Sequence, residues 1–257
     1  MTSPLRLYRP RKPSAAAIQV LAWAQGESDT LARLIEQDAA LMLSVLRQVN
    51  ATAADQKQSV GTLQDAMHDL GQQAVHQLAS LGVILAALED LPLDRQRTLH
   101  VLGQSVQVAS AAAEILGDTA EGRWAFTAGL MQDLGGLVLQ ANGSQGALPM
   151  VGLQGSALCW AEAKLHGQDH TQRGSQLAQD WGLPEQIVLA VAGHHDTEPG
   201  PRAGPVQETL RGLNLQASQP RVVHAPPLHD MLRPTPLGAR LSSPDRRTLA
   251  LSRMAAG

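Results

Sequence analysis

The chain has 257 residues, of which 44% are apolar and only 2% aromatic, and its formal net charge at pH 7 is −3. This small acidic balance gives no electrostatic reason to expect binding to nucleic acid or to an anionic membrane. The single cysteine, Cys159, excludes an internal disulfide framework and a cysteine-rich zinc site, so we expect a protein of the reducing cytoplasm.

Residues 1–13 are basic and contain prolines, which predicts a loose N-terminal tail. No apolar stretch follows these basic residues, so they lack the pattern of a secretory signal, and no apolar run has the length of a membrane span. Residues 14–196 then show one helical pattern after another, and none alternates with the two-residue period of a strand. The sequence therefore predicts an all-α domain over 14–196.

The helices of this domain are delimited by capping residues and glycines. Asp169 and Gln172 have the spacing of a capping box, in which each side chain satisfies a backbone amide of the other. The pair Gly135–Gly136 could interrupt the helix that contains it, because glycine weakens a helix interior. The longer predicted helices cover residues 72–89, 93–116, 122–140, 156–166, 169–181 and 184–195.

Residues 197–257 differ in composition from the preceding domain, because they contain many prolines and glycines. This composition predicts a partly irregular C-terminal extension with little hydrophobic core of its own. One short helix is predicted over 206–213. Ser243–Pro244 has the pattern of a helix cap and first turn, and it predicts a second short helix over 245–254.

Four of the predicted helices carry a polar side chain on an otherwise apolar face: Gln104, Asp133, His170, and the pair His194–His195. A buried carboxylate without partners is strongly unfavourable, so Asp133 requires hydrogen bonds or a cation. Two interpretations remain open. One is a hydrogen-bonded polar cluster between helices, which is the more common arrangement, and the other is a pocket for a metal ion or ligand.

The remaining histidines and tryptophans have simpler interpretations. Solvent-exposed positions on helix faces are predicted for His68, His76 and His100. Positions in the hydrophobic core are predicted for Trp124, Trp160 and Trp181.

Four stretches in a fixed order resemble a known family. They are LARLIEQDAALMLSVLRQVNATA (31–53), SVGTLQDAMHDLGQQAVHQLA (59–79), FTAGLMQDLGGLVL (126–139) and HGQDHTQRGSQLAQDWGLPEQIVLAVAGHH (166–195). Together they resemble the HDOD family, the HD-related output domain of bacterial signalling proteins, over about residues 14–196. The last stretch is the most specific. The resemblance implies an all-helical bundle related to HD phosphohydrolases, which usually lacks their complete set of metal ligands.

The resemblance also places the metal ligands of HD enzymes onto this chain. The first ligand histidine falls at Gln104, and the histidine of the His-Asp dyad falls at Gln132, whereas its aspartate is present as Asp133. Later ligand histidines match His170 and the pair His194–His195. The Gly-Tyr-Pro signature of the related cyclic di-GMP phosphodiesterases is absent. Because glutamine is a poor metal ligand compared with imidazole, two expected ligands are lost together.

The resemblance therefore implies a regulatory module with a degenerate pocket, which lacks catalysis and a cofactor and acts through protein partners in a signalling pathway. Two alternatives remain. The first is a metal-dependent phosphohydrolase or phosphodiesterase acting on a nucleotide, with Asp133, His170, His194 and His195 as ligands. The second is a sensor that binds a cyclic nucleotide without cleaving it.

Overall fold

The computed structural model describes residues 8–24, 26, 28–52, 60–143 and 153–217. All regular secondary structure in these ranges is α-helical, which confirms the predicted fold class. The helices are α1 (Ala15–Ala22), α2 (Ser28–Glu36), α3 (Ala39–Thr52), α4 (Leu63–Leu70), α5 (Gln72–Leu88), α6 (Arg95–Leu116), α7 (Ala120–Met131), α8 (Leu134–Asn142), α9 (Gly155–His166), α10 (His170–Asp180), α11 (Glu185–Gly193) and α12 (Pro205–Ala217).

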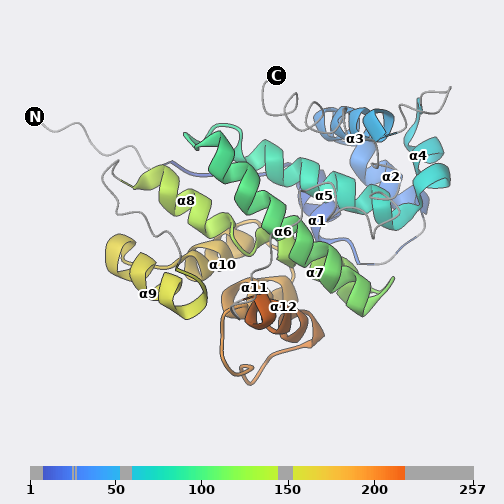
Figure 1. Ribbon diagram of the computed structural model, residues 1–257. Helices are drawn as coiled ribbons and strands as arrows, with labels where there is room; N and C mark the ends of the chain where they lie inside the picture. The colour runs from blue at the N-terminus through green and yellow to red at the C-terminus, as the bar shows by residue number, and fades with distance from the viewer. Residues whose placement is uncertain (1–7, 25, 27, 53–59, 144–152, 218–257) are drawn as a thin grey trace, which may run out of the picture.

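The helices form a bundle around α6 and α7, which make the most extensive helix–helix contact in the described structure (Figure 1). The helices α1 to α5 lie on one side of this pair, and α8 to α12 lie on the other. A single hydrophobic core runs through both sides. Leu21 of α1, Ile84 of α5, Leu130 of α7 and Ile187 of α11 are fully buried in it.

The close approach of α6 and α7 depends on a missing side chain. A Cβ atom placed on Gly129 of α7 would lie 2.5 Å from the Cα atom of Ala109 on α6. That separation is far below van der Waals contact, so only glycine fits at this crossing. The buried face of α6 consists largely of small residues, which allows α7 to lie close to the α6 backbone.

The helix predicted over 122–140 is broken, but at Gln132–Asp133 rather than at Gly135–Gly136, so the predicted position of the break is wrong. Gly135 has a different role. A Cβ atom on Gly135 would lie 2.0 Å from the backbone oxygen of His170, so this glycine allows α8 to pack directly on the start of α10. The break places Asp133 in the turn between α7 and α8.

Segments on both sides of the predicted domain, which were expected to be a loose tail and an irregular extension, make contacts with it. Within the predicted N-terminal tail, the backbone amide of Tyr8 donates to the side chain of Asn142 in α8, at 2.7 Å. In the predicted extension, the short helix expected over 206–213 is present as α12, which is longer at both ends and packs against α6, α7 and α11. The helix predicted over 245–254 lies outside the described residues.

Two predictions about side chains outside the candidate pocket are wrong. His76 is completely buried between Trp23 and Phe126, although an exposed position was predicted for it. Trp160 is 67% exposed, although a core position was predicted for it. In both helices the sequence pattern was too uniform in polarity to show which face turns inward.

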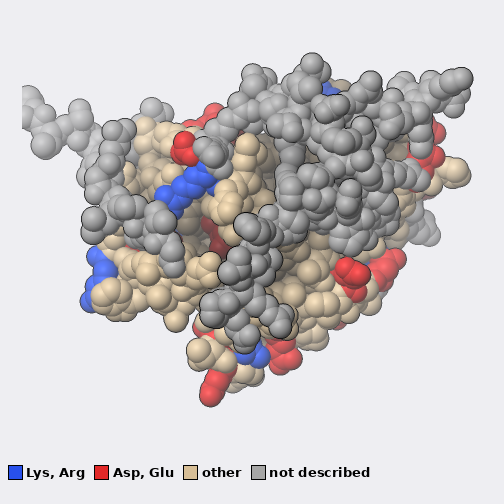
Figure 2. Space-filling model, viewed as in Figure 1, with Lys and Arg blue, Asp and Glu red and all other residues tan. Residues whose placement is uncertain are grey.

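The surface shows no concentration of positive charge on the face seen in Figure 2, where the described Lys, Arg, Asp and Glu side chains are scattered. Within the described residues, none of the helices combines the length and the apolarity needed to cross a membrane.

Candidate functional site

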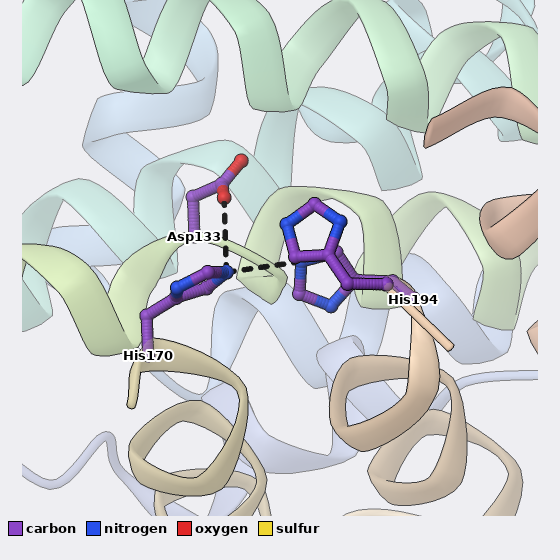
Figure 3. A group of neighbouring side chains, drawn as sticks. Asp133, His170 and His194 are labelled. Carbon is purple, nitrogen blue, oxygen red and sulfur yellow. Dashed lines mark hydrogen bonds and ion pairs between the residues drawn. The ribbon is translucent and has the colours of Figure 1, made fainter. Parts of the chain in front are cut away.

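Asp133, His170, His194 and His195 come together at one place in the bundle. Each offers one ligand atom, and these atoms all lie within 4.8 Å of one another. Asp133 stands in the turn before α8, His170 is the first residue of α10, and the histidine pair follows the last residue of α11. Figure 3 shows Asp133, His170 and His194 pointing toward one another. The structure thus brings together four of the six residues predicted for the pocket, and Gln132 adjoins them.

His170 is fixed in place by Glu162 of α9. One carboxylate oxygen of Glu162 accepts a hydrogen bond from the backbone amide of His170 at 2.9 Å and lies 2.5 Å from Nδ1 of the same residue. The helix that starts at His170 is capped separately, because Asp169 and Gln172 form the predicted capping box. Glu162 therefore orients the imidazole, with Nε2 directed into the cluster.

His194 presents the same nitrogen to the cluster. Its Nδ1 lies 2.8 Å from the backbone oxygen of Val191, so Nδ1 carries a proton and donates it. The Nε2 atoms of His170 and His194 are 3.3 Å apart, and His170 Nε2 lies 4.0 Å from Asp133. With protons on both Nδ1 atoms, two lone pairs face each other, and this arrangement is stable only with a proton or a metal cation between them.

The electrostatic environment shifts the pKa of His170 in the opposite direction from the pKa values of His194 and His195. Burial opposes protonation of His170, but the hydrogen bond to Glu162 and the negative charges of Asp133 and Glu162 outweigh it and raise the pKa of His170. Burial, reinforced by the neighbouring His195, lowers the pKa of His194 to about 3. Burial and the charge of His170 also lower the pKa of His195. A proton taken up by the cluster therefore resides on His170.

Gln132, which stands where the dyad histidine is expected, is 2% exposed and bonded on both sides. Its Nε2 donates to Asp133 at 3.0 Å, and its Oε1 accepts from Asn214 of α12 at 3.0 Å. Ser105 of α6 donates to the same oxygen of Asp133 at 3.4 Å. One oxygen of Asp133 is thus occupied by Gln132 and Ser105, and the other faces His170.

Gln104 is the predicted pocket residue that does not join the cluster. Its side chain is exposed, so the prediction that it points inward is wrong. The face of α6 that turns inward carries Ser105, Val106 and Ala109, one residue round the helix from the predicted stripe. The error has a physical reason, because α6 contains alanine, valine and serine on most sides and its apolar periodicity is weak.

Three residues of the site were missed by the sequence analysis: Ser105, Glu162 and Asn214. Asn214 carried a signal, since it continues the buried stripe of Val206 and Leu210 at four-residue spacing. Asp133 had been found by the same criterion. No sequence pattern indicates that Glu162 is buried, because its helix buries this carboxylate while exposing the larger apolar side chain of Trp160.

The four clustered side chains fit a transition-metal ion in their chemistry. Three imidazoles and one carboxylate form a donor set suited to Zn²⁺, Mn²⁺ or Fe²⁺. Ligand atoms around one such ion are at most about 4.2 Å apart, so the set would contract slightly on binding. The facing lone pairs of His170 and His194 support this assignment. Asp133, His170, His194 and His195 would hold the ion.

Comparison with known proteins identifies the fold. A family model for the HDOD domain matches residues 14–197. A candidate phosphohydrolase from Shewanella amazonensis SB2B superposes with a TM-score of 0.61 at 19% identity, covering 96% of this chain and 94% of that one. A candidate signal transduction protein from Marinobacter aquaeolei VT8 gives a TM-score of 0.64 at 22% identity, over 96% of this chain and 59% of that one.

An uncharacterised protein of Treponema pallidum (strain Nichols) is 23% identical over 195 residues. These residues are 73% of this chain but 37% of that protein, so the chain spans little more than a third of its curated relative. At these identities the solved structures establish the fold alone, so the chemistry of the site follows from its own residues.

Proposed function

Since the chain belongs to the HDOD domain family, which is related to HD-type phosphohydrolases and signalling proteins, we propose that it is a regulatory signal-transduction module without catalytic activity. In this proposal its partners are proteins, and its pocket is a binding site derived from a hydrolytic centre.

The observation that carries this proposal is the bonding of Gln132. In an HD enzyme the dyad histidine binds metal, but here an amide fills that position and is held by Asp133 and Asn214. Neutral amides bind divalent transition metals weakly compared with imidazole. Hydrolysis of a phosphoester requires the cation to hold the phosphate and to lower the pKa of water. A pocket that has lost this ligand, and in which Gln104 is exposed, retains at most part of that machinery.

The test is a metal analysis combined with an assay for turnover. The protein would be expressed with iron and manganese supplied, purified without chelators, and assayed with bis-p-nitrophenyl phosphate and cyclic di-GMP. We expect no hydrolysis above the background of the His170→Ala variant. Hydrolysis that disappears in that variant would overturn the proposal. Thermal stabilisation by a cyclic nucleotide without hydrolysis would instead identify a sensor.

One specific observation favours a second candidate, a metal-dependent phosphohydrolase. The four ligand atoms of Asp133, His170, His194 and His195 converge within 4.8 Å of one another, which is close to the requirement of a single ion. In this case Asp133 and the histidines would hold the ion, which would supply a polarised water, while the protein would position the phosphate. Metal bound in near-stoichiometric amount together with turnover would select this candidate.

A further inference from the structure

Among the described residues, the hydrogen bonds that join Glu162 to the cluster both go to His170. Glu162 is 7% exposed, and it belongs to α9, whereas the cluster residues come from α10 and from the ends of α7 and α11. Both of its described hydrogen bonds converge on one oxygen, which receives the amide of His170 at 2.9 Å and lies 2.5 Å from Nδ1. These contacts fix the position and the rotation of the ring at once.

The contact at Nδ1 also determines the tautomer. A carboxylate accepts hydrogen bonds and does not donate them, so Nδ1 of His170 carries the proton and Nε2 of the neutral ring carries the lone pair. The opposite tautomer would present an N–H to His194, and this ring would then be unable to bind a cation. Glu162 holds one proton on Nδ1, and the position of this proton decides whether Nε2 of His170 can bind a cation.

Helix capping does not account for this arrangement. The N-cap position of α10 is filled by Asp169, which accepts from the amide of Gln172, and the reciprocal bond from the Asp169 amide to the Gln172 side chain is also present. The backbone of His170 is already held against α8 by the close packing at Gly135. What Glu162 adds is the bond to the imidazole.

We propose that Glu162 is a positioning residue, which holds His170 in the tautomer that offers Nε2 to a single divalent transition-metal cation shared with Asp133, His194 and His195. The inference rests on the proposed function, in which this pocket binds without turnover. It assigns Glu162 no contact with the cation itself.

The first experiment measures the affinity for Zn²⁺ by competition with a chromophoric chelator. Loss of a carboxylate that orients a metal-binding histidine weakens binding by about 10- to 100-fold, and we expect this loss in Glu162→Ala. Glu162→Gln keeps an oxygen acceptor and removes the charge, so its affinity should fall between those of Glu162→Ala and the wild type. Glu185→Gln is the matched control, because that glutamate is exposed on α11 and pairs with Arg202.

The second experiment reads the tautomer in the metal-free protein at alkaline pH from the ¹⁵N chemical shifts of the His170 ring. We expect the proton on Nδ1 in the wild type and in Glu162→Gln, and on Nε2 in Glu162→Ala. Circular dichroism would establish that each variant is folded. If Glu162→Ala does not fold, the Zn²⁺ affinity of Glu162→Gln is compared with that of the wild type instead.

The outcomes separate the claims. Unchanged affinity and an unchanged tautomer in folded Glu162 variants would overturn the positioning role. A changed tautomer in a protein that binds no Zn²⁺ even as wild type would overturn the assignment of a cation. Weakened Zn²⁺ binding in the Glu162 variants, together with hydrolysis of phosphoesters by the wild type, would leave the role of Glu162 intact and overturn the proposed absence of catalysis.

Discussion

At the scale of single residues, the molecule contains two kinds of buried histidine. His170 is surrounded by carboxylates that favour its charged form, and these outweigh the effect of burial, so the pKa of His170 is raised. His76 has no carboxylate partner in the described structure. Its Nε2 binds the backbone oxygen of Val20 at 3.0 Å, and burial lowers its pKa to about 4. The two therefore affect stability in opposite directions as the pH falls.

His76 makes the fold sensitive to moderate acid. The unfolded chain protonates this ring near pH 6.5, whereas the folded protein resists protonation down to about pH 4. The unfolded state binds more protons in this window, so stability is full above pH 6.5 and is lost as the pH falls toward 4. The loss amounts to about 3 kcal/mol at most. Urea unfolding of wild type and His76→Gln between pH 7.5 and 4.5 should show a flatter profile for the variant.

His68 provides the control for this prediction, because it is exposed on α4 and pairs with its neighbour Asp69. The variant His68→Gln should keep the wild-type pH profile. An equally steep profile in His76→Gln would show that other groups, such as His194, dominate the acid response.

At the scale of helices, most of the architecture could be predicted from the sequence, because caps and apolar spacing act locally. The capping box at Asp169 and the stops at glycine lie where the pattern indicates. What could not be predicted is which face of a weakly amphipathic helix turns inward, as Gln104 and Trp160 show. Gly135 illustrates a second limit, because the sequence does not distinguish a glycine required for close helix packing from a glycine that ends a helix.

Two neighbouring glycines of α8 should respond oppositely to substitution. In Gly135→Ala the new Cβ would lie 2.0 Å from the backbone oxygen of His170, so α8 and α10 must separate, at a cost of about 1–3 kcal/mol or more. In Gly136→Ala the nearest atoms are at 3.6 and 3.8 Å, which is ordinary contact, and alanine favours the helix by about 0.5–1 kcal/mol. Thermal unfolding of the pair measures the difference. Equal effects would contradict the packing of α8 on α10.

At the scale of the whole molecule, α12 belongs to the folded unit, although it lies beyond the residues matched by the family model. Val206 and Leu210 are 1% and 0% exposed, and Asn214 reaches the site through Gln132. The sequence analysis assigned this helix to an extension because proline-rich composition surrounds it. A helix between irregular segments contributes too little local signal to reveal the surface on which it packs.

Removing α12 should therefore destabilise the rest of the protein. Burial of two aliphatic side chains contributes about 1.5–3 kcal/mol each, so a chain ending at residue 204 should melt more than about 6 °C below the wild type. A chain ending at residue 217 is the control, because it retains the whole of α12. Equal melting temperatures for the two truncated chains would show that α12 contributes no stability.

A single substitution tests the contact with the site. Asn214→Ala leaves the buried oxygen of Gln132 without this donor, at a cost of about 1–3 kcal/mol. Gln216→Ala, at an exposed position of the same helix, should change stability by less than about 0.5 kcal/mol. Chemical denaturation of both variants provides the comparison, and equal values would mean that the bond to Gln132 is dispensable.

The bonding of Gln132 has a consequence for substitution at this position. Its amide satisfies Asp133 next to it and Asn214, which lies 82 positions later in the chain and on a helix outside the family domain. A histidine at position 132 would have to satisfy both partners at once, at a position that is almost closed to water. A His-Asp dyad at this position would thus require coordinated change at residues far apart in the chain, because Gln132 is bonded to Asp133 and to Asn214 at the same time.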